Sequence, residues 1–278
     1  HHQKEEAENI LKEAVAIIRK YEAIFSLFDD NSEVARLNKA GKLDRPSAEF
    51  IKLITISQNF SHQTDGAFDI SIQPLWNLYK NHFSNNNQLD LNEQISHVIG
   101  SVGWQNISVD HGKIAFKKPT MSVSFNGIAQ GYITDKVTEF LSSQGFDHTL
   151  VDIGEYRAGG TQANGEPWQI GLLDPFDQVS IASVMPISKG ALATSGGYGD
   201  MFDGTGKYHH IFNAKTGLSS DLYASVSVKA ADATTADALS TAFSNMSLKQ
   251  IENVIGHYND VEVRLTLNDG ERLKLKSS

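Results

Sequence analysis

Helices and short strands are predicted in no regular order along this chain of 278 residues, and that irregularity limits the folds open to it. Apolar side chains recur at helical spacing over residues 4–25, which predicts a long amphipathic helix. A short second helix is predicted through Leu37, with Asn31-Ser32 as its cap and an end near Gly41. Further helices are predicted over residues 47–63, 127–143, 234–247 and 248–258.

The predicted strands are short and gather in the second half of the chain. Two apolar runs, 261–267 and 272–275, flank Asn268-Asp269-Gly270, which is a strong hairpin signal. An earlier hairpin is predicted around Asp110-His111-Gly112. Other strands are predicted over residues 149–153, 168–173, 181–187, 191–194 and 224–229. Because strands and helices do not alternate as in a doubly wound sheet, the sequence favours an α+β fold with mixed sheets and packed helices.

The length admits one large domain or two small ones, and the sequence favours one. No repeat, low-complexity tract or break in composition offers an interdomain linker. The best loop candidate, Ser84-Asn85-Asn86-Asn87, is short. We therefore expect residues 1–278 to form a single two-lobed domain.

Charge and residue usage exclude several functional classes. The formal net charge is −9, whereas binding to a nucleic-acid backbone needs a dense basic surface, so nucleic acid is not an expected partner. The lack of cysteine excludes thiolate metal sites, disulfides and a cysteine nucleophile. No apolar run reaches the length of about 18 residues that a membrane span needs. The functional classes that these observations leave open are an acidic enzyme and an acidic ligand-binding protein.

Asp237 and Thr241 stand four residues apart near a predicted helix start, so their oxygens project from one face of the helix. A carboxylate beside a hydroxyl suits a hard cation such as Mg²⁺, and a helix start favours a nearby phosphate. The alternative is that Asp232, Thr234 and Asp237 only cap the helix and complement its dipole.

Two glycine-rich regions offer further candidate sites. Gly127 and Gly131 bracket a helix start, where the backbone could approach a ligand closely; tight packing of a strand onto the helix is the alternative. A polar loop over residues 193–200 precedes His209-His210. Neighbouring residues on an extended strand point to opposite faces, so one histidine can face a site while the other faces solvent. A hydrogen-bonded structural histidine is the alternative.

Gly66-Ala67-Phe68-Asp69 predicts a turn that carries an aromatic ring and a carboxylate. Phe68 could stack on a planar ring while Asp69 accepts hydrogen bonds from it. The alternative is that Phe68 and the following Trp76 are simply parts of the core.

Taken in order, seven segments of the chain resemble the ApbE family, which consists of FAD:protein FMN transferases. The resemblance extends from about residue 20 to residue 260. The segments are Phe28-Asp-Asp-Asn-Ser-Glu-Val-Ala-Arg-Leu-Asn38, Gly66-Ala-Phe-Asp69, Gly127-Ile-Ala-Gln-Gly-Tyr132, Val151-Asp-Ile-Gly-Glu155, Ala193-Thr-Ser-Gly196, His210-Ile-Phe-Asn-Ala-Lys-Thr-Gly217 and Ala236-Asp-Ala-Leu-Ser-Thr241.

The resemblance implies Mg²⁺-dependent chemistry on FAD within a single ApbE-like domain. Family members cleave the FAD pyrophosphate, attach FMN through a phosphoester to a threonine of an acceptor flavoprotein, and release AMP. Two alternatives stay open: an FAD-binding or flavin-carrier protein without transferase activity, and an FAD hydrolase that gives FMN and AMP. The resemblance also implies an exported, periplasmic location, with the export signal not expected in this chain.

The resemblance assigns roles to individual residues. The metal ligands would be the backbone carbonyl of Ala129 and the side chains of Asp237 and Thr241. His210 occupies the position of the histidine implicated in the reaction, and with Asp237 it forms the expected catalytic pair. An imidazole with a pKa near neutrality suits a general base for the acceptor hydroxyl. The expected FAD contacts are Phe28, Ala67, Phe68, Asp69, Asn126, Tyr132 and Phe212.

The chain departs from the family pattern at several positions. Gln130 stands where the family commonly has lysine, and Asn213 stands where it has an acid. Ser240 replaces an additional acidic metal ligand found in some members. The family's N-terminal strand with a Met-Gly-Thr-like motif has no counterpart in this sequence. With Gln130 in place of lysine, we expect neutralisation of the FAD phosphates to depend more strongly on the metal.

Overall fold

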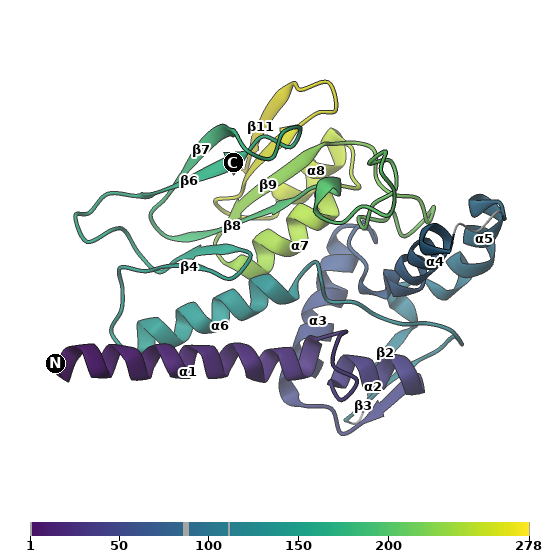
Figure 1. The fold of residues 1–278 in the computed structure, drawn as a ribbon, viewed down its shortest axis with the longest axis horizontal. Helices are drawn as coiled ribbons and strands as arrows, with labels where there is room; N and C mark the ends of the chain where they lie inside the picture. The colour runs from purple at the N-terminus through teal and green to yellow at the C-terminus, as the bar shows by residue number, and fades with distance from the viewer. Residues whose placement is uncertain (1, 86–88, 111, 278) are drawn as a thin grey trace.

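The computed structural model describes residues 2–85, 89–110 and 112–277. The largest sheet among these residues is antiparallel and has the strand order β11-β10-β9-β8-β5-β4 (Figure 1). A separate two-stranded sheet pairs β6 with β7. The strand bounds are β4 (Leu150–Asp152), β5 (Tyr156–Ala158), β6 (Trp168–Leu173), β7 (Ile181–Ile187), β8 (Gly190–Ser195), β9 (Ser225–Ala230), β10 (Glu262–Thr266) and β11 (Arg272–Lys276).

Strand β8 is buried on both faces and connects two parts of the core. Because side chains alternate along a strand, Leu192 packs with Ile170 and other residues of the β6–β7 pair, whereas Ala191 and Ala193 face the main core. Helix α7 (Ala233–Phe243) packs against β8 on that second side. The small alanine side chains let the helix lie close to the sheet, which fixes the position of any residue that α7 carries.

Helices α6 (Ala129–Ser143) and α7 meet at Gly131. A Cβ atom at this position would lie 2.6 Å from the carbonyl carbon of Ala233 and 2.8 Å from Cβ of Asp237. The backbone N–H of Gly131 donates a hydrogen bond to Oδ2 of Asp237 over 3.0 Å. The alternative of tight packing therefore holds at Gly131, although the neighbour is a helix rather than a strand.

We expect Gly131→Ala to lower the free energy of unfolding by about 1–3 kcal/mol, because overpacking forces the two helices apart. Helix propensity alone predicts the opposite sign, since alanine in a helix is favoured over glycine by about 1 kcal/mol. Urea denaturation measures the difference. Gly204→Ala is the control, because nothing lies within 4 Å of the added Cβ, and it should stay within about 0.5 kcal/mol of the parent. A stabilised Gly131→Ala variant would contradict the close helix contact.

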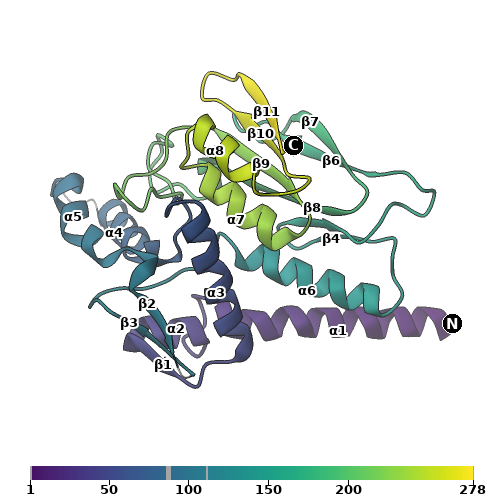
Figure 2. The same cartoon turned by 180° about the vertical axis from the view of Figure 1, so that it is seen from behind.

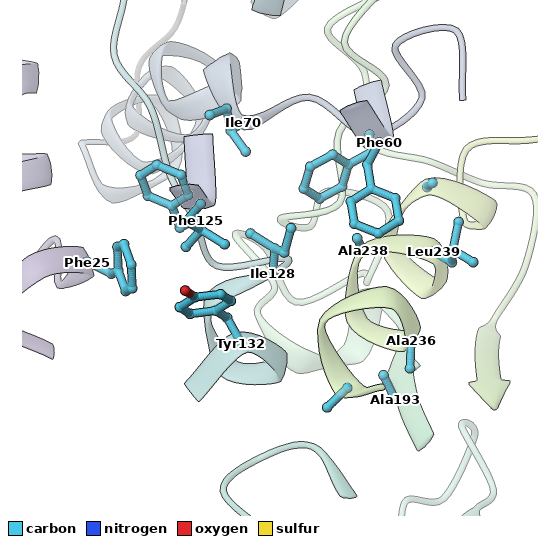
Figure 3. Packing of buried hydrophobic residues seen from close by; sticks show 14 of the residues in the cluster. Phe25, Phe60, Ile70, Phe125, Ile128, Tyr132, Ala193, Ala236, Ala238 and Leu239 are labelled. Atoms are coloured by element: carbon cyan, nitrogen blue, oxygen red, sulfur yellow. The ribbon is translucent and has the colours of Figure 1, made fainter. Parts of the chain in front are cut away.

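Helix α1 (His2–Phe25) lies beside α6 in both views of the molecule (Figures 1 and 2). The rings of Tyr21 and Tyr132 meet edge to face with their centroids 5.7 Å apart. The ring centroids of Phe25 and Phe125, two residues labelled in Figure 3, lie 5.6 Å apart. This aromatic cluster joins α1, α6 and the segment before α6 into one core. The remaining elements of the first half are α2 (Glu33–Ala40), β1 (Lys42–Asp44), α3 (Ala48–Gln63), α4 (Gln73–Ser84), α5 (Leu91–Val98), β2 (Ile107–Asp110) and β3 (Lys113–Phe116).

The segment 210–217 is anchored on α4 and α5. The hydroxyl of Tyr79 donates to the carbonyl oxygen of Gly217 over 3.0 Å, and the Tyr79 and Phe212 ring centroids lie 4.8 Å apart. Gly217 has a φ of +75°, and a Cβ there would lie 2.6 Å from Cγ2 of Ile95. Glycine is therefore required at this turn, and the contacts hold the segment that carries His210.

The α+β prediction is confirmed, as are the predicted long helices and the strands of both hairpins. The helix expected from residue 127 begins instead at Ala129, because residues 126–128 form a turn. The helix expected over residues 234–247 ends at Phe243, and the helix expected over residues 248–258 ends at Ile255. His111 of the predicted hairpin turn and Asn86-Asn87 of the loop candidate lie outside the described residues. Across the described parts of the chain, no helix has the length and apolar character needed to cross a membrane.

The sequence does not predict β1, β5, α4 or α5. The strands β1 and β5 have three residues each and exist through pairing with β3 and β8 rather than through a local pattern. Helices α4 and α5 pack on each other, and α4 also carries Tyr79, which contacts residues far along the chain. Tertiary contacts therefore decide these elements.

Candidate functional site

A cavity of about 520 Å³ opens where α6, α7, β8 and the turn after α3 meet. Its volume lies within the range of about 300–1,000 Å³ that is typical of small-molecule sites. All predicted site residues except Tyr132 line it: Phe28, Ala67, Phe68, Asp69, Asn126, Ala129, His210, Phe212, Asp237 and Thr241. The structure thus brings together residues that lie more than two hundred positions apart in the sequence.

One end of the cavity carries two buried carboxylates. Asp237 is 4 % exposed and comes from α7, while Glu155 is 8 % exposed and comes from the connection between β4 and β5. Burial raises the pKa of Asp237, and burial together with the negative charge of Asp237 raises the pKa of Glu155. No ion pair within the described residues joins either carboxylate to a lysine or arginine. A proton or a bound cation would neutralise this charge.

Hydroxyl groups surround the carboxylate end. The Oγ atom of Ser195 lies 2.7 Å from Oγ of Ser240 and 3.4 Å from Oγ1 of Thr241. A Cβ at Gly127 would lie 2.8 Å from Oγ1 of Thr241, so the start of the α6 segment approaches this hydroxyl closely. The site therefore gathers oxygen donors from α7, β8 and the α6 segment.

These donors fit a hard divalent cation. Carboxylate, hydroxyl and carbonyl oxygens are the ligands that Mg²⁺ accepts, and it usually keeps several waters as well. Within residues 2–85, 89–110 and 112–277, no group of three or more histidine, aspartate or glutamate side chains has metal-binding spacing. A cation here would therefore need the Thr241 hydroxyl and the Ala129 carbonyl beside the carboxylates of Asp237 and Glu155.

The helix-capping alternative for α7 is resolved by its contacts. Asp232 is the N-cap, because its carboxylate accepts the backbone N–H of Thr235 over 2.8 Å. Thr234 donates its hydroxyl to Asp135, which also accepts the backbone N–H of Ala233 over 2.7 Å. Asp237 caps nothing in α7 and instead faces α6 and the cavity.

The other end of the cavity is apolar. Phe68 is buried, and its ring lies 6.2 Å from that of Phe60, while Phe28 is 93 % exposed at the cavity wall. The Nδ2 amide of Asn245 donates to the carbonyl of Phe212 over 3.1 Å and reaches the carbonyl of Ala67 at 3.5 Å. Asn245 thus ties together two walls that come from distant parts of the chain.

Asp69 lies at the cavity but its oxygens are engaged by the protein. Oδ1 accepts the backbone N–H and the hydroxyl of Ser71 over 2.8 and 2.7 Å, and Oδ2 accepts the backbone N–H of Trp104 over 3.0 Å. Burial raises the pKa of this carboxyl while these donors oppose the shift. Asp69 therefore holds the turn that bears Ala67 and Phe68 at the cavity, and its expected hydrogen bonding to a ligand stays a prediction.

The two neighbouring histidines have separate surroundings. His210 lines the cavity, and its Nδ1 donates to the carbonyl oxygen of Asp200 over 3.1 Å. A carbonyl can only accept, so the neutral ring carries its proton on Nδ1 and leaves Nε2 as an acceptor. Burial lowers the pKa of His210. His209 is buried, with Nε2 on the carbonyl of Ser220 at 2.8 Å, so it is structural rather than solvent-facing.

Tyr132 corrects one expectation, because its side chain lies in the core and not at the cavity (Figure 3). Its hydroxyl donates to Glu49, and its ring packs between Tyr21 and Phe25. Burial and the Glu49 carboxylate raise the pKa of this phenol. On α6, Gly131 faces α7, whereas the side chain of the next residue, Tyr132, points to α1.

Glu155 lines the cavity but is not among the site residues that the sequence predicts. It closes the segment Val151-Asp-Ile-Gly-Glu155, so the resemblance did contain a signal for it. No local pattern marks it as a site residue, because its partner Asp237 is far away in the sequence. Gln130 also lines the cavity, and its side-chain amide lies against Gly154.

Comparison with known proteins adds a sequence relationship to this geometry. The family model described as the ApbE family matches residues 2–265. The FAD:protein FMN transferase of Haemophilus influenzae is 30% identical over 250 residues, which cover 84% of this chain and 72% of that protein. The FAD:protein FMN transferase of Vibrio cholerae is 29% identical over 226 residues, which cover 78% and 67%.

Solved structures share the fold over almost the whole chain. The ApbE protein of Thermotoga maritima superposes with a TM-score of 0.86 at 28% identity, covering 98% of this chain and 89% of that one. The flavin transferase ApbE from Vibrio cholerae gives a TM-score of 0.83 at 24% identity, with the same coverage, and shows the fold alone.

Proposed function

Because this chain belongs to the ApbE family, we propose that it is a transferase that moves FMN from FAD to an acceptor flavoprotein. The observation that carries the proposal is the composition of the cavity, whose lining combines the aromatic rings of Phe28, Phe68 and Phe212 with the two buried carboxylates of Asp237 and Glu155. Such a cavity suits a ligand with a planar ring at one end and phosphates at the other. The similarity to FAD:protein FMN transferases supports the same assignment.

The proposed reaction is a phosphoryl transfer. The hydroxyl of an acceptor threonine attacks the FMN phosphorus of FAD, a phosphoester bond forms there, and the pyrophosphate bond breaks. AMP leaves with the bridging oxygen, and the hydroxyl proton passes to a base. Reactions of this kind depend chiefly on positioning and on neutralisation of phosphate charge.

We propose that the oxygen donors at the carboxylate end hold Mg²⁺. Asp237, Thr241 and the carbonyl of Ala129 are the proposed ligands, and Glu155 adds a second carboxylate beside them. When bound, Mg²⁺ would neutralise charge on the pyrophosphate and improve AMP as a leaving group. Gln130 can donate neutral hydrogen bonds to a phosphate but brings no positive charge, which increases the dependence on the cation.

His210 is the proposed general base. Its Nδ1 proton is held by the Asp200 carbonyl, so Nε2 is free to accept the proton of the acceptor hydroxyl. Phe68, Phe212 and Phe28 would contact the flavin ring at the apolar end. A base and a ring-binding surface in one cavity place the two substrates in fixed relation, which is the main requirement of the reaction.

Incubating the protein with FAD, Mg²⁺ and an FMN-binding domain tests the proposal, and mass spectrometry should show a covalent FMN increment on a threonine of that domain. The same mixture with EDTA should show no increment. If the protein binds FAD but adds no FMN to a domain that another FAD:protein FMN transferase does modify, the transfer activity is refuted. Steady AMP release without an acceptor would instead identify an FAD hydrolase, and binding with neither product would identify a flavin carrier.

An exported location stays a prediction from the family resemblance. Fractionation of cells that express the full-length gene would test it.

A further inference from the structure

Helices α6 and α7 lie against each other and cap each other's first turns (Figures 1 and 2). The first turn of a helix leaves backbone N–H groups without partners inside the helix. On α6, the N–H of Gly131 donates to Asp237 of α7 over 3.0 Å. On α7, the N–H groups of Ala233 and Thr234 donate to Asp135 of α6 over 2.7 and 2.9 Å. Each helix therefore supplies a carboxylate that caps the other one.

Asp135 connects this pair of helices to the large sheet as well. Its carboxylate is buried and also accepts the hydroxyl of Thr234 and the guanidinium of Arg157, which belongs to β5. Arg157 follows Glu155 by only two residues, so the ion pair restrains the segment that carries Glu155. One buried carboxylate thus contacts both α7 and β5 from its place on α6.

The oxygen donors proposed for the cation come from these same three parts of the chain. Ala129 begins α6, Asp237 and Thr241 belong to α7, and Glu155 directly precedes β5. Mg²⁺ demands near-ideal geometry from its ligands, so it tolerates little error in their positions. A slide of α7 along α6 by part of a helical turn would separate the Ala129 carbonyl from both α7 side chains. The reciprocal caps oppose such a slide, because it would break hydrogen bonds at both helix starts.

We propose that Asp135 is a positioning residue for the cation site, which it serves by fixing the register of α7 on α6 and by holding β5 against both helices. This inference rests on the proposed function, because the role of the oxygen donors as cation ligands is itself proposed. Asp135 does not line the cavity, so it acts through Asp237 and the helix that carries it, and not on a bound ligand.

The hydrogen bonds at Asp135 require a carboxylate of this length. Oδ1 accepts the guanidinium of Arg157 and the N–H of Ala233, while Oδ2 accepts both the N–H and the hydroxyl of Thr234. Asparagine would place an NH₂ group, which only donates, where one of these oxygens stands. Glutamate would keep both oxygens and the charge, but its additional methylene would push the start of α7 away from α6.

The experiment is to titrate Mn²⁺ into the Asp135→Asn and Asp135→Glu variants well below their thermal midpoints and to measure free Mn²⁺ by electron paramagnetic resonance. Both variants should bind Mn²⁺ about 10- to 100-fold more weakly than the parent, the usual cost of losing a group that orients metal ligands. Thr234→Val removes one donor and no charge, so its loss should be smaller, about two- to fivefold. Asp232→Ala is the matched control, because it removes the N-cap that the α7 segment supplies to itself. Its thermal midpoint should fall while its Mn²⁺ affinity stays at the parent value.

Hydrogen exchange gives a second readout, which needs no cation. If Asp135 holds α7 in register, its loss also weakens the hydrogen bond from the Gly131 N–H to Asp237. The Gly131 amide should then exchange about tenfold faster in Asp135→Asn than in the parent, because exchange follows local opening. In Asp232→Ala the same amide should keep the parent rate.

Two results would overturn the inference. One is parent Mn²⁺ affinity in the Asp135 variants or, if neither of them folds, in Thr234→Val, since other contacts would then set the register. The other is weak binding by Asp135→Asn with full affinity in Asp135→Glu, which would mean that the charge of this residue matters and its position does not. If the parent protein binds no Mn²⁺, the proposed cation site fails, and exchange of the Gly131 amide decides separately whether Asp135 fixes the register.

Discussion

Asp237→Asn should eliminate measurable FMN transfer while leaving the fold intact. The substitution keeps the shape of the side chain and an oxygen that can accept the Gly131 N–H, but it removes the negative charge that would hold Mg²⁺. Loss of a metal ion that stabilises transition-state charge costs several kcal/mol, so we expect the rate to fall by about 10³-fold or more. Covalent FMN on the acceptor domain measures the rate, and titration with Mn²⁺ or Mg²⁺ measures cation affinity.

Stability and a matched variant separate the charge effect from damage to the structure. Burial disfavours the charged form of Asp237, so a neutral amide should leave the thermal midpoint unchanged or raise it. Asp232→Asn makes the same chemical change on the same helix, but at the N-cap, where asparagine caps equally well. It should retain transfer. An active Asp237→Asn protein with unchanged cation affinity would refute the metal assignment.

Local spacing in the sequence predicts the pair Asp237 and Thr241 on α7, but it does not predict that Glu155 lies beside them. Asp237 and Thr241 share a helix face because they are four residues apart, and this holds whatever the rest of the chain does. Glu155 faces Asp237 only because β5 pairs with β8 and α7 packs on β8. A pattern confined to a few neighbouring residues contains no information about that contact.

Tyr132 and Asp69 show the limit of transferring roles by position. Both belong to segments that resemble the family, and both segments reach the cavity. Within them, the direction of each side chain depends on tertiary packing. Tyr132 turns toward the aromatic cluster of α1, and Asp69 is held by Ser71 and Trp104. The sequence therefore predicts which segments reach the cavity more reliably than which way each of their side chains points.

His210→Gln should lower the transfer rate by about 10²–10⁴-fold, the usual contribution of a positioned general base. Glutamine can still donate to the Asp200 carbonyl but cannot take up a proton at neutral pH. FAD affinity should stay within about threefold of the parent, because the substitution removes proton transfer and leaves the ring-binding and carboxylate ends of the cavity intact. Single-turnover kinetics together with FAD titration separates the two effects.

The pH dependence of the transfer rate gives a second, independent test of His210 as the general base. Burial lowers the pKa of His210 below its ordinary value of 6.5, so the ring is neutral and able to act as a base at neutral pH. Protonation removes that ability, so the parent rate should fall as the pH drops below about 6.5 and should be flat just above it. His210→Gln should lack this acidic limb. His209→Gln is the matched control: His209 is buried and bonded to Ser220, so its loss should lower the thermal midpoint while the acidic limb remains. A His210→Gln enzyme that keeps the limb would show that another group accepts the proton.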